Sequence, residues 1–146
     1  MASAHDVAAY ILGRQGRMTA MKLQKLVYYS QAWTTVWHER ALFPERIEAW
    51  ANGPVVPELY HVHRGTFELS EWPRGDADLL TAADREAVDA VLDYYGDRPA
   101  QWLSDLTHDE DPWLSARVGL APLERGNHEI TLSSMEEYYA SLLAED

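Results

Sequence analysis

Six histidines stand among 24 acidic residues, so the first chemistry to consider is a metal site or an acid–base hydrolase. His61 and His63 form the closest pair, but side chains two residues apart on a helix point about 200° away from each other, so one ion cannot bind both. His108 precedes a denser run of carboxylates that includes Asp109 and Asp111. A histidine at a helix end commonly bonds the last carbonyl groups and complements the helix dipole. We interpret His108 as structural and keep a small hydrolase, using His108 with Asp109 or Asp111, as an alternative.

Other catalytic signatures are missing from the sequence. The chain has no cysteine, which excludes disulfides, thiolate zinc sites and cysteine nucleophiles. It contains no glycine-rich phosphate loop, no Gly-x-Ser-x-Gly nucleophile motif and no His-Glu-x-x-His zinc motif. We therefore expect a protein that is not an enzyme and that holds no cofactor and no metal.

Tryptophan and tyrosine form the second conspicuous group of side chains. The chain has six tryptophans and eight tyrosines against two phenylalanines, more than a minimal core requires. Tyr28 and Tyr29 are adjacent, and adjacent residues on a helix point about 100° apart, so one member of the pair is expected near the surface. Partly exposed tyrosine and tryptophan side chains anchor protein interfaces. The aromatic content therefore favours a protein-binding module.

The acidic charge lies in the second half of the chain. The formal net charge is −12; residues 1–75 carry eight basic and seven acidic side chains, and residues 76–146 carry four and seventeen. An acidic surface repels the phosphate backbone, whose binding requires clustered Lys and Arg, so we expect no autonomous nucleic-acid binding. A basic protein would be attracted to such a surface, whereas a merely solubilising role is the alternative.

Length and hydropathy indicate one cytoplasmic domain over residues 1–146. A chain of this length buries roughly two-thirds of its surface on folding. Its longest apolar runs are far shorter than the ~18 residues of a membrane-spanning helix, so we expect no membrane insertion. The N-terminus lacks the basic and apolar segments of a signal peptide.

Hydrophobic periodicity predicts a mainly α-helical single domain of about six or seven helices around a long central helix. Ser3 and Asp6 form a capping box for a first helix that Gly13 would end, and Thr19 begins the long helix, whose apolar residues continue to Trp37. Further helices are expected after Pro54, Thr81, Pro99, Asp111 and Ser133. At most a small β-sheet is expected, near residues 46–50, 79–80 and 129–131.

An ordered set of motifs then resembles a known family. It comprises Leu23-Gln24-Lys25-Leu26-Val27-Tyr28-Tyr29, then Trp50-Ala51-Asn52-Gly53-Pro54-Val55 with Tyr60, then Thr107-His108 and Pro112-Trp113-x-x-x-Arg117. In this order and approximate spacing the motifs resemble the Panacea domain of SocA/GepA-like (phage-associated) antitoxins. The resemblance covers roughly residues 7–143. Its motif positions are Leu23, Lys25, Leu26, Tyr28, Trp50, Gly53, Pro54, Val55, Tyr60, Thr107, His108, Pro112, Trp113 and Arg117.

The resemblance implies an antitoxin that neutralises a protein toxin encoded by an adjacent gene. Toxins of the family include translation inhibitors, among them nucleotide-pyrophosphate synthetases that modify tRNA. Direct protein–protein binding is the implied mechanism. One branch of the family instead delivers its toxin to an ATP-dependent protease, which is the alternative mechanism for this chain.

The motif residues have structural interpretations. Gly53 and Pro54 would form a turn, Trp50 and Trp113 would fill the core, and His108 with Thr107 would satisfy a helix end. A domain that accepts varied toxins should keep its scaffold and vary its surface. We therefore expect the toxin contacts on solvent-facing residues outside the motifs, namely Tyr29, Trp33, Asp84, Glu86, Asp89 and Asp93.

Overall fold

The computed structural model describes residues 1–144, and its central element is the long helix α2 (Ala20–His38). Thr19 caps this helix, because its side chain accepts a hydrogen bond from the backbone N–H of Lys22. Every residue from Leu23 to Thr35 is buried. A helix buried all round lies in the middle of a domain, so the expected long central helix is confirmed.

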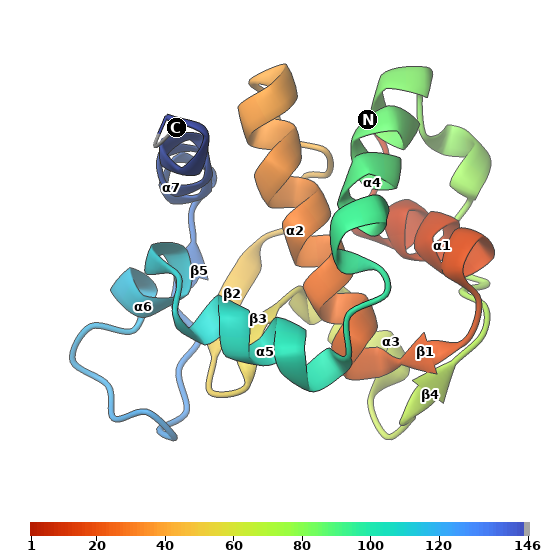
Figure 1. The fold of residues 1–146 in the computed structure, drawn as a ribbon. Coiled ribbons are helices and arrows are strands. Elements are labelled where there is room, and N and C mark those ends of the chain that lie inside the picture. Colours follow the sequence, from red (N-terminus) through yellow and green to blue (C-terminus); the bar gives the residue numbers. More distant parts are fainter. Residues whose placement is uncertain (145–146) are drawn as a thin grey trace.

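The other helices pack around α2, with α4 and α7 on opposite sides of it (Figure 1). Helices α1 and α5 also pack against α2. The bounds are α1 Ala4–Gln15, α3 Pro57–His63, α4 Ala82–Tyr95, α5 Ala100–His108, α6 Asp111–Ala116 and α7 Leu132–Leu143. Seven α-helices within residues 1–144, with only small sheets, confirm the mainly helical single domain.

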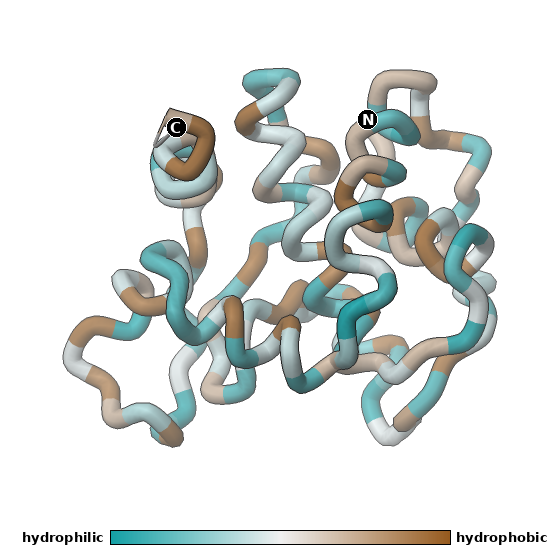
Figure 2. Tube along the Cα trace, in the orientation of Figure 1, coloured by the Kyte–Doolittle hydropathy of each residue, from teal (hydrophilic) through white to brown (hydrophobic). Residues whose placement is uncertain are grey.

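Helix α4 separates its apolar and polar residues onto two faces. Val88, Val91 and Leu92 are buried, whereas Glu86 and Asp93 are exposed. Hydrophilic and hydrophobic residues accordingly alternate along this helix (Figure 2). One face packs on α2, and the other face presents acidic side chains to solvent.

The larger of two small sheets joins distant parts of the chain. Strands β2 (Ile47–Trp50) and β3 (Gly53–Val55) form a hairpin, and β5 (Glu129–Ile130) pairs antiparallel with the other edge of β2. The second sheet pairs β1 (Met18–Thr19) with β4 (Glu68–Leu69). The expected strands near 46–50 and 129–131 are confirmed; the two-residue strands of the second sheet are too short for periodicity to indicate.

Three local predictions are wrong, each because a hydrogen bond from a different backbone N–H determines where the element begins or ends. Gly13 lies inside α1, which ends at Gln15 because the N–H of Gly16 bonds the carbonyl of Leu12. The strand expected at residues 79–80 is replaced by a 3-10 helix, η1 (Ala77–Leu79), begun by the side chain of Asp76. Helix α7 is capped by Thr131 rather than Ser133.

Candidate functional site

Four consecutive carbonyl groups of the β2–β3 hairpin, those of residues 49–52, accept hydrogen bonds from side chains of the second half of the chain. The donors lie on α5, on α6 and directly after α6. The bonds are Arg117 Nη1 to Ala49 O at 2.9 Å, Trp113 Nε1 to Trp50 O at 2.8 Å, His108 Nε2 to Ala51 O at 3.0 Å and Ser104 Oγ to Asn52 O at 3.3 Å. We call this set the hairpin clamp. It brings the sequence motifs of both halves of the chain together.

His108 uses both ring nitrogens in the fold. Its Nδ1 lies 2.5 Å from the carbonyl oxygen of Ser104 and its Nε2 lies 3.0 Å from that of Ala51. Both ring nitrogens are therefore within hydrogen-bond distance of backbone carbonyl oxygens. The nitrogens face backbone carbonyls rather than Asp109 or Asp111, so the geometry gives the hydrolase alternative no support.

Lys25, Gly53 and Thr107 meet at one point beside the hairpin clamp. Lys25 is 1% exposed, and burial lowers the pKa of its amine to about 8. A Cβ atom on Gly53 would lie 2.7 Å from Lys25 Cε and 3.3 Å from Thr107 Oγ1. Gly53 also has a φ of 120°, which side chains rarely allow. The backbone therefore requires glycine here, and an added Cβ would also displace the end of the buried Lys25 side chain.

The remaining motif residues support a structural interpretation. Trp113 is buried, as expected, but Trp50, the last residue of β2, is only half-buried, and its ring packs against Tyr60. Leu23, Leu26, Tyr28, Val55 and Pro112 are buried. These contacts place the motif inside the scaffold rather than on a free surface.

A buried carboxylate lies at the centre of the aromatic residues. Glu110 is 4% exposed, and its Oε1 accepts hydrogen bonds from the hydroxyl groups of Tyr29 at 2.7 Å and Tyr139 at 2.8 Å. Burial raises the pKa of Glu110 to about 6, although the two phenol bonds act in the opposite direction. The hydroxyl of Tyr139 also lies 3.0 Å from that of Tyr28. The carboxylate thus connects α2 with α7.

Two aromatic residues expected to face a toxin are instead part of this core. Tyr29 is 0% exposed, because its ring stacks on Tyr95 at 4.1 Å between centroids and its hydroxyl bonds Glu110. Trp33 is 9% exposed; its Nε1 donates to the hydroxyl of Tyr95, and Trp37 stacks on its ring. The prediction that Tyr29 and Trp33 face solvent is wrong, since α2 is covered from several sides.

Asp84 is also buried, so its expected exposure is wrong. It closes the capping box of α4, accepting from the backbone N–H of Thr81, and Arg40 Nη2 donates to it at 2.7 Å. These bonds hold the pKa of Asp84 below its usual value despite the opposing effect of burial. Its charge stabilises the N-terminus of α4 and is not presented to a partner.

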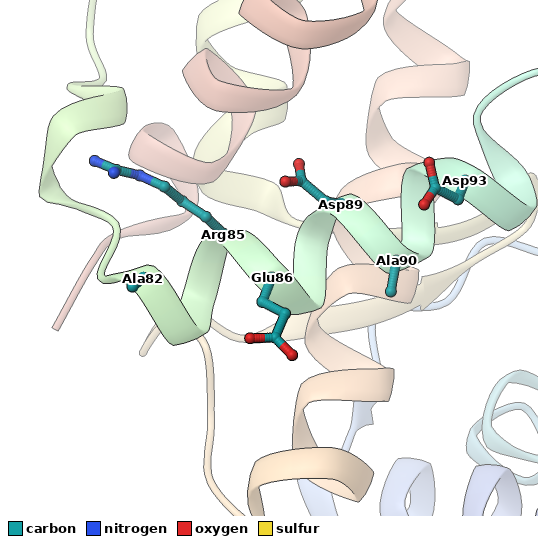
Figure 3. A pocket seen from close by; sticks show the side chains of 6 residues that line it. All are labelled: Ala82, Arg85, Glu86, Asp89, Ala90 and Asp93. Atoms are coloured by element: carbon teal, nitrogen blue, oxygen red, sulfur yellow. The ribbon is translucent and has the colours of Figure 1, made fainter.

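The outer face of α4 carries the other three predicted contact residues (Figure 3). Asp89 and Asp93 point to one side of the helix and Glu86 to the other, around a shallow depression of about 530 Å³. Asp89 is half-buried, because Tyr10 Oη donates to it at 2.7 Å and Arg14 Nε lies 3.6 Å away. Glu86 and Asp93 are exposed, and their carboxylates form no ion pair or hydrogen bond with other residues of the described range 1–144. The face therefore presents two unpaired carboxylates, with the exposed Arg85 at the edge of the same depression.

The burial of Lys25 and Glu110 was not predicted from the sequence. For Lys25 there was one indication of burial, its position within the wide apolar arc of the long helix. For Glu110 there was no indication of burial, since its two hydrogen-bond partners lie 81 and 29 residues away in the chain. Partners so distant leave no local pattern.

Within residues 1–144 no three His, Asp or Glu side chains are close enough to form a metal site. His63 is buried against Gln24 while His61 is exposed, as expected for side chains on different faces of α3. None of the helices in the described range is long and apolar enough to cross a membrane.

Comparison with known proteins identifies the family. A family model described as "Antitoxin SocA-like, Panacea domain" matches residues 23–114, more than half of the chain. The match runs from the start of α2 into α6, a shorter range than the 7–143 expected from the motifs. Neither the curated proteins nor the solved structures contain a match. The chain belongs to the family of SocA-like antitoxins with a Panacea domain.

Proposed function

We propose that this protein neutralises a protein toxin by binding it directly. The observation that carries the proposal is the match of residues 23–114 to the SocA-like antitoxin family. The proposed toxin is the product of an adjacent gene and inhibits translation, for example as a nucleotide-pyrophosphate synthetase that modifies tRNA. A protein that binds tRNA carries clustered Lys and Arg side chains.

Charge complementarity supports the outer face of α4 as part of the toxin-binding surface. Glu86 and Asp93 are exposed there, and Asp89 lies between them. Exposed carboxylates attract a basic partner and increase its association rate, and they would compete with RNA for the same toxin surface. The proposed mechanism is steric occlusion, with a total buried area of about 1,200–2,000 Å².

The proposed antitoxin domain is the whole chain, residues 1–146. Helices α1 and α7 lie outside the matched range, but both pack on α2. Tyr139 of α7 supplies one of the two phenol groups that bond Glu110. We propose a cytoplasmic location, where a translation inhibitor acts.

Co-expression with the product of the adjacent gene tests this function. Growth should be restored, and the two proteins should co-purify as a complex that weakens as the salt concentration rises. A toxin that stays lethal and never co-purifies would contradict the proposal. The toxin half-life separates the two mechanisms, because a half-life shortened by this protein would indicate delivery to an ATP-dependent protease.

A charge-matched pair of variants tests the surface. Glu86→Gln with Asp93→Asn removes two negative charges from α4, and Glu136→Gln with Glu137→Gln removes two from the exposed side of α7. We expect only the α4 variant to reduce the association rate, by on the order of tenfold at low salt. Equal effects of both variants would mean that net charge alone matters.

A further inference from the structure

Three side chains at the junction of α4 and α5 form an exposed stack of rings around a cation. The Arg98 guanidinium carbon lies 4.5 Å from the ring centroid of Trp102 and 6.0 Å from that of Tyr94. Tyr94 is 61% exposed and Trp102 is 37% exposed. Tyr94 is the one tyrosine in the described part of the chain that is classed as exposed. We call this group the Tyr–Arg–Trp stack.

The stack is held in place by the core beneath it. The ring of Tyr94 packs edge-on against that of Tyr95, with 4.6 Å between the ring centroids, and Tyr95 stacks on the buried Tyr29. The backbone N–H of Arg98 donates to the carbonyl of Tyr95 at 3.0 Å, which fixes the turn between the two helices. A side chain already ordered in the unbound protein loses little conformational entropy on binding. These rings are therefore preorganised for a partner.

The acidic residues near the stack favour a basic partner. Asp93, Asp97 and Asp105 are exposed and lie within three residues of a member of the stack along the chain, whereas Arg98 is its single cation and lies against the two rings. Exposed aromatic faces bordered by carboxylates complement Arg and Lys side chains, which interact with both the rings and the acids. A nucleic acid would be repelled by the same carboxylates.

The stack also continues the proposed toxin-binding face. Glu86, Ala90 and Tyr94 are spaced four residues apart, so they follow one another along the same side of α4. The depression on the outer face is lined by Glu86 and Ala90, and the stack begins one turn further along. Acidic residues and aromatic anchors thus form one surface.

We propose that the Tyr–Arg–Trp stack is the aromatic anchor of the toxin interface, and that it contacts a basic toxin surface in which Arg or Lys side chains border an apolar pocket. This inference rests on the proposed function, because the toxin is its partner. Tyrosine, tryptophan and arginine are the residue types that dominate the binding energy of interfaces. The carboxylates would increase the association rate, and the stack would slow the dissociation of the complex.

The test measures binding of the full-length chain to the product of the adjacent gene. Tyr94→Ala and Trp102→Ala should each weaken binding by on the order of thirtyfold, mainly through faster dissociation. Phe67→Ala is the matched control, because Phe67 is a 76% exposed aromatic residue just before β4 that belongs neither to the stack nor to the outer face of α4, so it should leave binding unchanged. A thermal melt of each variant shows whether it is folded.

Nitration of tyrosine by tetranitromethane provides a second measurement on the wild-type protein, independent of any substitution. Tyr94 should be nitrated first in the free protein and protected in the complex. If the wild-type chain does not bind the toxin, the proposed function and this inference both fail. If it binds while Tyr94→Ala and Trp102→Ala bind equally well, or while Tyr94 stays reactive in the complex, only the inference fails. A change in the oligomeric state of free Tyr94→Ala would assign the stack to self-association and would also overturn the inference.

Discussion

Two pairs of arginine and tryptophan, each four residues apart on the chain, lie in opposite environments. Arg117 lies 5.1 Å from the ring centroid of Trp113 and both are buried, whereas Arg98 lies 4.5 Å from that of Trp102 at the surface. In the buried pair, the side chains also donate to carbonyl groups of the hairpin. The comparison shows that residue type and spacing do not assign a role. The buried pair holds the scaffold, and we assign the exposed pair to binding.

The two arginines should differ in what they contribute to stability. Arg117 donates to the carbonyl groups of Ala49, Ala121 and Glu124, so Arg117→Ala removes three hydrogen bonds, and the bond to Ala49 is buried. We expect a loss of about 4 kcal/mol in the free energy of unfolding. Arg98→Ala, the matched control, should change stability by less than about 0.5 kcal/mol. Urea denaturation measures both, and equal losses would contradict the assignment.

The second prediction concerns the glycine at the hairpin clamp. Gly53→Ala forces a side chain onto a backbone with φ of 120° and against Lys25, so we expect a loss of about 3 kcal/mol. Gly65 has φ of 84° with nothing within 4 Å of an added Cβ, so Gly65→Ala should cost only about 1 kcal/mol. Thermal melts of the two variants separate steric crowding from backbone strain. A similar cost for both would show that Lys25 moves aside freely.

The buried amine of Lys25 should make the stability of the protein depend on pH. The pKa of Lys25 is about 8 in the folded protein against 10.5 in the unfolded chain, so between these pH values only the unfolded chain holds the proton. The free energy of unfolding should therefore rise from pH 8 to 10.5. Below pH 8 the folded protein bears the full cost of burying the charged amine, about 3 kcal/mol. Lys25→Met should be more stable than wild type at pH 7 by up to that amount. The difference between the two proteins should disappear near pH 10.5, and a difference independent of pH would contradict the argument.

The fourth prediction concerns Glu110. Its folded pKa is raised to about 6 from 4.5, so its contribution to stability is full below pH 4.5 and is lost as the pH rises through 6. Glu110→Gln keeps an oxygen for both phenol groups, so it should exceed wild-type stability by about 2 kcal/mol at pH 7 and match it at pH 4. Tyr139→Phe removes one donor and should move this pH window upward. Stability curves measured by urea denaturation at several pH values provide the test.

Much of the fold was predictable because local signals agreed with the tertiary contacts. The capping residues Ser3, Thr19 and Thr81 all act as expected, since a cap bonds backbone groups two or three residues away. The strand at 79–80 was not predictable, because Asp76 bonds the backbone N–H of Asp78 and tightens the chain into a 3-10 turn. Sequence patterns predict an element correctly where its hydrogen-bond partners are near in the chain.

The candidate surface was predictable only in part. Periodicity correctly placed Glu86 and Asp93 on the outer face of α4, because the opposite face of that helix is strongly apolar. It failed for Tyr29 and Trp33, since α2 is covered by both α4 and α7 and has no solvent side at these positions. The exposed ring of Tyr94 follows from the same packing, because its neighbour Tyr95 occupies the core.

The sequence by itself determined the helical class, the position of the acidic charge and the family, because periodicity, composition and ordered motifs are properties of the chain. Only the tertiary structure decided which aromatic and charged residues are buried. Glu110 meets Tyr29, and Arg117 meets Ala49, across 81 and 68 residues. Burial depends on what packs over a residue, and residues so far apart meet only in the folded protein.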